Sequence, residues 1–474
     1  MLRKTFYTIL FIATFLFLHP SYGQGLKDNI NNAYQQFVKS GKLPNGIASL
    51  TVLDGKTGQP IFTSNASIGL PTASTMKVIT SITALDILGA DYTYQTKLAY
   101  TGEIDSLGVL HGDIIVIGSG DPTLGSDRYT TTKAETILNK WVYKVHHAGI
   151  RHIDGRVVGD DLYLNGNDVP PTWNWVDIGN YYGAGISGLN WRENKTGVTF
   201  SPSAIGQPAK ISSTTIPLTG ITLINEVITG SNGSGDNVYA YAAPYSDIVY
   251  LRGTYGRDLK KIVEIAVPDP ALALAQQLTT ALSDADITVD SLPITGKRLL
   301  NQGIMLNSQK KELDTHQSPA LKDIVHWFNQ KSINLYGEAM LKSFGIISHN
   351  KPNSEDAATL LSKYWEQKLK IPASELHIHD GSGLSPQNRV TTLAMAKIMH
   401  YAQHRPWYPA FKKSLPTING ITMKSGTIGG VLGYTGFHTS KAGAPVTFSL
   451  LVNNYTGSTS VMRQEMFNLL NSLK

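Results

Sequence analysis

The sequence predicts an α+β fold: one discontinuous domain, formed by both ends of the chain and interrupted by inserted mixed and β-rich domains. Strand-like and helix-like segments occur together near both ends. The middle of the chain is rich in Gly, Ser, Thr, Asn and Tyr and contains short alternating β runs. A length of 474 residues also exceeds that of one ordinary domain, so two or three compact units are expected.

The N-terminal part of the discontinuous domain begins with a helix predicted over residues 26–38, where apolar residues recur with helical spacing. Strands are predicted at 47–53 and 61–63, because the segment between them, Asp54-Gly55-Lys56-Thr57-Gly58, is a strong hairpin signal. From Ser74 to Leu88 the apolar residues again follow one helical face.

The insertions and the C-terminal part follow in order. Strands are predicted at 113–117, 155–160, 421–424 and 445–452, and helices at 132–147, 271–282, 318–344 and 460–473. We assign residues 24–95 and 298–474 to the discontinuous domain. Residues 96–165 and 258–297 form an inserted α/β domain, and residues 166–257 form a small β-rich domain nested within it.

Residues 1–23 have the pattern of a secretory signal peptide. Arg3 and Lys4 provide the positive start, and Phe6 to Leu18 is almost continuously apolar. This stretch of about 13 residues is shorter than the roughly 20 that a spanning helix needs. We therefore expect an exported protein that begins near Gln24 and has no transmembrane segment.

The composition excludes several classes of function. Cysteine is absent, which excludes disulfides, a thiolate zinc site, a cysteine nucleophile and a cysteine-linked lipid anchor. The formal charge of +6 falls to +4 when Arg3 and Lys4 leave with the signal peptide, and basic residues are scattered rather than clustered. Nucleic acid is therefore not an expected partner.

Two Ser-x-x-Lys tetrapeptides are candidates for a serine nucleophile with a lysine base, Ser74/Lys77 and Ser308/Lys311. Such a pair needs the first turn of a buried helix, where residues three apart share one face. Ser74 opens an apolar helix, whereas Ser308 lies in a polar run. A surface helix explains most isolated matches, but the context selects Ser74 as the nucleophile and Lys77 as the base.

A Ser-x-Asn motif, Ser332-Ile333-Asn334, lies between two apolar helical segments, at a junction that would direct both polar side chains into a cleft. The alternative is that Ser332 caps the following helix and Asn334 is incidental.

A Lys-Ser/Thr-Gly tripeptide occurs four times, beginning at Lys39, Lys56, Lys195 and Lys424. A substrate-binding lysine needs a strand edge beside the nucleophile. Lys424 ends a predicted strand and precedes Ser425, Gly426 and Thr427. Glycine in this position lets another backbone approach the strand closely, so we select Lys424.

In this order and spacing, the three motifs resemble those of penicilloyl-serine enzymes. The chain resembles the D-alanyl-D-alanine carboxypeptidase/endopeptidases of the penicillin-binding protein 4 type (class C low-molecular-mass penicillin-binding proteins) over essentially its whole mature length. Residues 118–124, 183–190 and 380–385 are similar as well. The resemblance implies a β-lactamase/transpeptidase-like catalytic domain, an antiparallel sheet with helices, in 24–95 and 298–474. It also implies the periplasm. Ser425 stands where threonine is usual and keeps the hydroxyl, which suggests tuned activity.

The resemblance implies a serine-type D-Ala-D-Ala carboxypeptidase/endopeptidase that acts on peptidoglycan stem peptides, uses no cofactor or metal, and is inhibited covalently by β-lactams. Ser74 would form the acyl-enzyme. Lys77 would take its proton directly or through a relay that includes Ser332, and the sequence leaves both open. Burial and a second cation, Lys424, are expected to favour neutral Lys77.

The remaining roles also follow from the resemblance. Asn334 would hold Lys77 and the substrate amide, and Lys424 with the hydroxyls of Ser425 and Thr427 would bind the terminal carboxylate. Backbone N–H groups of Ser74 and Thr427 would form the oxyanion hole. Asp160 lies where the family places an acidic residue for the diaminopimelate side chain.

Two other functions stay open: a non-catalytic cell-wall-binding module, and a serine β-lactamase. The latter needs a carboxylate that positions water, for which Glu338 is the nearby candidate unless it lies on a solvated helix face. A metal site at His377, His379 and Asp380 is disfavoured, because no His-Glu-x-x-His pattern is present. An aromatic cluster could stack on sugar rings, although a packed core is the commoner explanation; its members are Trp173, Trp175, Tyr181, Tyr182 and Trp191.

Overall fold

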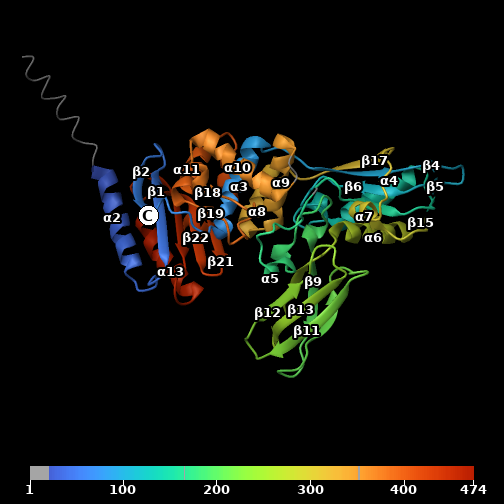
Figure 1. Ribbon diagram of the computed structural model, residues 1–474, viewed down its shortest axis with the longest axis horizontal. Coiled ribbons are helices and arrows are strands. Elements are labelled where there is room, and N and C mark those ends of the chain that lie inside the picture. The colour runs from blue at the N-terminus through green and yellow to red at the C-terminus, as the bar shows by residue number, and fades with distance from the viewer. Residues whose placement is uncertain (1–20, 165, 351–352) are drawn as a thin grey trace, which may run out of the picture. The chain divides into compact units, whose positions relative to one another are not determined.

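The computed structural model describes residues 21–164, 166–350 and 353–474 (Figure 1). They form two compact units. The first comprises the residues through Ile82 together with Ser362–Ile378 and Pro386–Lys474, and the second comprises Thr83–Leu361 and His379–Ser385. The charged start and apolar stretch of the predicted signal peptide lie outside the described residues. Within the described part, none of the helices has the length and apolar character needed to cross a membrane.

The first unit is built on a six-stranded antiparallel sheet in the order β2-β1-β23-β22-β21-β20. Its strands are β1 (Ile47–Asp54), β2 (Pro60–Ser64), β20 (Thr417–Ile418), β21 (Ile421–Ile428), β22 (Val431–Thr439) and β23 (Pro445–Asn453). The helices that begin in this unit are α2 (Ser21–Val38), α3 (Lys77–Ile87), α11 (Thr392–Ala402), α12 (Tyr408–Ser414) and α13 (Thr459–Leu470). A two-stranded ribbon pairs β18 (Leu376–His377) with β19 (Arg389–Val390).

Strand β1 shows how the alternation of side chains builds this unit. Leu50 and Val52 belong to a core shared with residues of α2 and α13. Figure 1 shows these two helices beside the sheet. Ser49 and Thr51 point to the opposite face, where their hydroxyls lie 2.7 and 2.9 Å from the hydroxyl of Thr392 on α11. Helix α11 therefore packs on the face of β1 opposite the apolar core, and hydroxyl hydrogen bonds join the two elements.

The second unit contains the α/β sheets. A five-stranded sheet has the order β16-β8-β6-β3-β17, and a four-stranded sheet has the order β15-β7-β5-β4. The strands are β3 (Gln95–Tyr100), β4 (Glu103–Ile104), β5 (Val109–His111), β6 (Ile114–Ile117), β7 (His152–Ile153), β8 (Val157–Asp160), β15 (Thr288–Val289), β16 (Ile294–Thr295) and β17 (Lys311–Gln317). Helices α4 (Ala134–His147) and α6 (Pro270–Ser283) bury their apolar faces in the core beside these sheets, and α7 (Gly296–Asn301) follows β16.

The β-rich segment of the second unit forms two three-stranded sheets, β10-β9-β14 and β11-β13-β12, over one shared core. Their strands are β9 (Lys195–Ser201), β10 (Lys210–Thr214), β11 (Thr222–Gly230), β12 (Asp236–Tyr241), β13 (Ile248–Gly256) and β14 (Val263–Ala266). The short helix α5 (Trp175–Ile178) precedes them. Helices α8 (Leu321–Lys331) and α9 (Asn334–His349) also belong to this unit, and α10 (Ser354–Leu369) runs across the boundary into the first.

The predicted α+β fold with an antiparallel sheet formed by both ends of the chain is confirmed, whereas the three-way domain assignment stays a prediction. Two local expectations differ from the structure. The helix predicted from Ser74 begins as a 3₁₀ turn, Ala73–Met76, and the strand predicted to end at Lys424 continues to Ile428.

Candidate active site

Ser74 lies in the 3₁₀ turn η1 (Ala73–Met76), directly before α3. The turn is fastened by Thr75, whose backbone N–H and side-chain hydroxyl both donate to the carbonyl of Thr72, at 3.3 and 2.6 Å. Ala73 has φ = +45°, in the left-handed region that residues with a side chain rarely adopt. Such a residue costs about 1–3 kcal/mol and persists only where its surroundings enforce it. Tertiary packing therefore fixes the backbone immediately before Ser74.

Lys77 is the first residue of α3, and its side chain is fully buried. Its Nζ lies 3.0 Å from Ser74 Oγ, within hydrogen-bonding distance. An amine in this position, when neutral, can accept the hydroxyl proton and so activate the serine. The predicted serine–lysine pair therefore has the geometry that its chemistry requires.

The tripeptide that begins at Lys424 lies within β21, next to η1. The short strand β20 pairs only with Ile421 and Thr422 of β21. Among the described strands, the residues from Lys424 to Ile428 are therefore paired on one side only, with β22. The predicted strand edge is present at the tripeptide itself.

A cross-strand pair of glycines brings this edge close to the nucleophile turn. Gly426 on β21 is opposite Gly433 on β22. A Cβ at position 426 would lie 2.8 Å from Thr75 N and 2.9 Å from Ser74 N, and one at position 433 would lie 2.9 Å from Thr75 Cγ2. These distances are shorter than contacts that real side chains make, so both positions need glycine for the turn to seat on the sheet.

Lys424 is buried, with 2% of its surface exposed, and its Nζ donates to the carbonyl of Ser425 at 2.8 Å. Burial lowers the pKa of Lys424 to about 7, because the charged ammonium loses its hydration. Near pH 7 Lys424 therefore has a neutral form as well as a charged one, so the expected second cation at this place is not permanently charged. A carboxylate bound beside it would favour the charged form.

Ser332 and Asn334 lie at the junction of α8 and α9, in the second unit. Ser332 has φ = +57° and ends α8 in the left-handed conformation. The N-cap position of α9 is occupied by Ile333, and Ser332 lies one residue before it. The alternative in which Ser332 is the N-cap residue of the second helix is therefore wrong. The side chain of Asn334 is largely buried, and its Nδ2 donates to the carbonyl of Tyr182 at 2.8 Å.

Helix α9 also carries Glu338, which lies near a second acidic residue, Asp380. Glu338 is fully buried, so the alternative that it lies on a solvated helix face is wrong. Its Oε1 accepts a hydrogen bond from the backbone N–H of Gly381 at 3.0 Å. Burial, reinforced by the nearby carboxylate of Asp380, raises the pKa of Glu338 to about 8. Asp380 itself accepts from Trp173 Nε1 at 2.8 Å and from two backbone N–H groups of its own loop, those of residues 383 and 385.

Asp160, the last residue of β8, is nearly buried, and its carboxylate is paired with Lys310 Nζ at 2.8 Å.

The rejected tetrapeptide lies elsewhere in the same unit. Ser308 is exposed and outside any helix, and Lys311 begins β17 and pairs with Glu103. Among the described residues, there is no group of three or more His, Asp or Glu side chains arranged to hold a metal ion.

The first unit thus brings together Ser74, Lys77 and the strand segment 424–427, while Ser332, Asn334 and Asp160 belong to the second unit. Sequence reasoning missed the strain at Ala73, the need for Gly433 and the burial of Glu338. A signal existed only for Gly433, which is one of two glycines that flank Tyr434-Thr435 in an otherwise β-forming run.

The structure is similar to solved structures of penicillin-binding protein 4. It matches penicillin-binding protein 4 from Haemophilus influenzae with a TM-score of 0.77 at 22% sequence identity, covering 94% of this chain and 99% of that one. A second structure of that protein, in complex with a β-lactam, matches with a TM-score of 0.72. At this level of identity, the likeness establishes the fold.

The sequence comparisons add the family. The model of the D-Ala-D-Ala carboxypeptidase 3 (S13) family matches residues 30–472, so the chain belongs to that family. A D-alanyl-D-alanine carboxypeptidase from Actinomadura is 26% identical, over 89% of this chain and 80% of its own. The carboxypeptidase DacB from Haemophilus influenzae is 24% identical, over 83% and 82%. The predictions of a penicillin-binding protein 4 relative and of a carboxypeptidase-type hydrolase are confirmed.

Replacing Gly426 with alanine should push β21 away from the nucleophile turn, because the new Cβ would lie within 3 Å of Ser74 N and Thr75 N. A displacement of this kind at reacting groups costs about 100-fold in rate. We expect Gly426→Ala to react about 100-fold more slowly with a labelled penicillin while keeping its circular dichroism spectrum. Gly429→Ala is the matched control, since a Cβ there has no heavy atom within 4 Å. Equal rates in both variants would contradict the close approach.

Replacing Glu338 with glutamine should change how stability depends on pH. The folded state raises the pKa of Glu338 to about 8, above its ordinary value of 4.5, so the wild type loses stability as pH rises from about 4.5 to about 8. Each pH unit in this window changes the free energy of unfolding by about 1.4 kcal/mol per proton. Glu338→Gln does not titrate, and we expect it to gain on the wild type between pH 5 and pH 8 in urea unfolding. Glu366→Gln, at an exposed position, is the control and should leave the pH dependence unchanged. If the free energy of unfolding depends on pH in the same way in the wild type and in Glu338→Gln, the raised pKa is refuted.

Proposed function

We propose that this protein is an exported serine-type D-Ala-D-Ala carboxypeptidase/endopeptidase that acts on peptidoglycan stem peptides through an acyl-enzyme on Ser74 and is inhibited by β-lactams. The observation that carries the proposal is the 3.0 Å distance between the fully buried Lys77 Nζ and Ser74 Oγ. Membership of a D-Ala-D-Ala carboxypeptidase family supports the substrate class. The β-lactam complex of the similar penicillin-binding protein 4 supports the inhibitor class.

In the proposed reaction, Ser74 Oγ attacks the carbonyl carbon of the penultimate D-alanine while its proton passes to the neutral amine of Lys77. The peptide C–N bond then breaks, and the proton moves to the departing amine. Water attacks the ester on Ser74 and releases the shortened peptide. Backbone N–H groups of Ser74 and Thr427 are the proposed donors to the developing oxyanion. Their elements lie in contact, with Gly426 seated against Ser74 N.

The strand edge from Lys424 to Thr427 suits the terminal carboxylate of the substrate. Lys424 supplies an ammonium, and Ser425 and Thr427 supply hydroxyls. We assign Ser332 to proton relay and Asn334 to holding the substrate amide, as the family resemblance implies. Asp160 is proposed for the cationic end of a diaminopimelate side chain. Its pairing with Lys310 means that such a group would have to compete with an existing cation.

The β-lactamase alternative has less support. A β-lactamase needs an ionised carboxylate that positions water for rapid deacylation, and burial instead raises the pKa of Glu338 to about 8. A protonated acid that accepts from Gly381 N is a structural group rather than a general base. The non-catalytic alternative is opposed by the fully buried Lys77 beside Ser74, because burying an amine costs free energy that a purely structural role does not require.

Acylation tests the proposed nucleophile and base. We expect a labelled penicillin to form one adduct, located at Ser74 by peptide mass spectrometry. Lys77→Ala should slow adduct formation by about 10²–10⁴-fold, the usual contribution of a general base. Ser308→Ala and Lys311→Ala, in the rejected tetrapeptide, are the matched controls and should react like the wild type. An adduct on any other residue, or unchanged acylation of Lys77→Ala, would overturn the assignment.

The pKa of Lys424 predicts a specific pH dependence. The ammonium is charged below about pH 7, so recognition of a terminal carboxylate should weaken as pH rises above 7. The ratio of kcat/KM for a free-acid D-Ala-D-Ala peptide to that for its C-terminal amide should fall about tenfold per pH unit above 7. Effects of pH on the chemical step that are common to both peptides cancel in the ratio. Lys424→Arg, which stays charged, should make the ratio independent of pH between 6 and 9. A flat wild-type ratio would remove Lys424 from carboxylate binding.

A further inference from the structure

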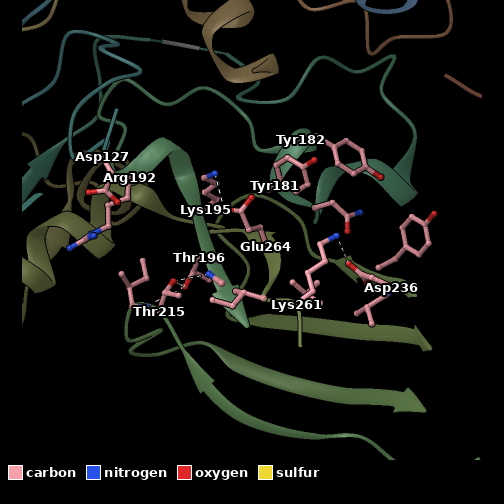
Figure 2. A pocket seen from close by; sticks show the side chains of 17 residues that line it. Asp127, Tyr181, Tyr182, Arg192, Lys195, Thr196, Thr215, Asp236, Lys261 and Glu264 are labelled. Atoms are coloured by element: carbon pink, nitrogen blue, oxygen red, sulfur yellow. Dashed lines mark hydrogen bonds and ion pairs between the residues drawn. The ribbon is translucent and has the colours of Figure 1, made fainter. Parts of the chain in front are cut away.

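The second unit contains a cavity of about 600 Å³ that the proposed reaction does not use. Its walls come from the turn Tyr181–Gly183 and from strands β9, β12 and β14. Figure 2 shows Asp127 and Arg192 at one side and Asp236 with Lys261 at the other. The volume lies within the roughly 300–1,000 Å³ typical of small-molecule sites.

The charges that line the cavity balance one another. Lys195 Nζ lies 2.8 Å from Glu264 Oε1, and Lys261 Nζ lies 3.0 Å from Asp236 Oδ2 (Figure 2). Arg192 donates from Nε to Gln277 Oε1 at 3.2 Å and is also influenced by the carboxylate of Asp127. Three cations thus face three carboxylates. The cavity offers many hydrogen-bond donors and acceptors but no net charge that would attract an ion.

The tripeptide Lys195-Thr196-Gly197, which was rejected as the substrate-binding motif, lines this cavity. Its lysine differs from Lys424 in that carboxylates already surround it. Lys195 is already paired with Glu264 and lies 3.6 Å from a second carboxylate, that of Glu193. A ligand carboxylate would have to displace both partners. The preferred ligand is therefore polar and uncharged.

Exposed tyrosine rings supply the other half of the surface. Tyr181 and Tyr239 line the cavity and are 49% and 42% exposed, which is high for large aromatic side chains. The aromatic cluster singled out in the sequence divides here. Trp173 and Trp191 are buried in the core, whereas Tyr181 faces the cavity. Exposed aromatic rings beside paired charges suit a sugar, whose C–H face packs on a ring while its hydroxyls bond to the polar groups.

One contact ties the cavity to the predicted catalytic motif. The carbonyl of Tyr182 accepts the hydrogen bond from Asn334 Nδ2 at 2.8 Å, and Tyr182 also lines the cavity. The ring of Tyr181 packs edge-to-face on that of Tyr182, with centroids 5.4 Å apart. A ligand on these rings would therefore contact the same turn that holds Asn334.

We propose that this cavity binds an uncharged oligosaccharide of N-acetylated amino sugars, the chemistry of the glycan strand that carries stem peptides. The identity of the glycan rests on the proposed peptidoglycan substrate. The site itself rests on the tyrosine rings, the balanced ion pairs and the volume. A chain that binds both the glycan and the stem peptide would favour polymeric substrate over free peptide.

The test is titration of the full chain with N-acetylchitotetraose, followed by calorimetry. We expect saturable binding that Tyr239→Ala and Tyr181→Ala each weaken about three- to tenfold, the usual contribution of one aromatic contact. Tyr239→Phe keeps the ring and should retain the wild-type affinity. Tyr143→Ala is the matched control: Tyr143 is 60% exposed on α4 and lies outside the cavity, so its loss should have no effect.

The specificity of the site is tested with two further sugars. Cellotetraose, which lacks the acetamido groups, should bind at least threefold more weakly, and the anionic tetragalacturonate should not compete. Equal binding of cellotetraose, or tighter binding of tetragalacturonate, would overturn the proposed ligand. So would equal losses of affinity in Tyr239→Ala and Tyr143→Ala.

Two measurements on the wild-type protein, sugar binding and penicillin labelling, test the glycan site and the proposed acyl-enzyme separately. If penicillin labels Ser74 but no sugar binds, the glycan site is wrong and the acyl-enzyme proposal stands. If the sugar binds and Ser74 is not labelled, the glycan site stands and the protein is a wall-binding module rather than a penicillin-sensitive enzyme.

Discussion

The close approach of strand β21 to the nucleophile turn is the constraint on which the candidate site depends. No side chain fits at Gly426, because its Cβ would meet the backbone of Ser74 and Thr75. The turn comes from the N-terminal part of the chain, and β21 comes from the C-terminal part. They meet because β1 and β23 pair along their full lengths, from Ile47 opposite Asn453 to Asp54 opposite Val446. The long-range strand pairing thus creates the site, and the glycine pair Gly426/Gly433 lets the two parts seat against each other.

Burial sets the chemistry of the charged groups in both units. Lys424 and Glu338 have ordinary pKa values far apart, yet burial brings that of the lysine to about 7 and that of the acid to about 8. In each case the neutral form gains, because the interior hydrates a charge poorly. As pH rises past 8, Lys424 has lost its charge and Glu338 acquires one. Strand β21, proposed to bind the substrate carboxylate, and helix α9, which carries Glu338, therefore both contain a group whose charge changes at alkaline pH.

The same tripeptide has different uses in different settings. Lys195-Thr196-Gly197 and Lys424-Ser425-Gly426 both lie on strands, and both glycines stand where a Cβ would clash. Lys195 is neutralised by Glu264, whereas the buried Lys424 donates to a backbone carbonyl. This difference is why we propose a neutral polar ligand for the first setting and a carboxylate for the second. Partner charges and burial, rather than the motif, decide what each lysine can bind.

The sequence by itself determined the α+β class, the approximate positions of several strands and helices, and the pairing of Ser74 with Lys77. These depend on local periodicity and on a spacing of three residues, which any helical turn converts into proximity. Only the tertiary structure decided the rest: the strained Ala73, the left-handed Ser332, the burial of Glu338 and the cavity beside Tyr181. Each of these is set by residues distant in the chain. Burial and strain are properties of packed neighbours, and no local pattern in the sequence specifies which neighbours those are.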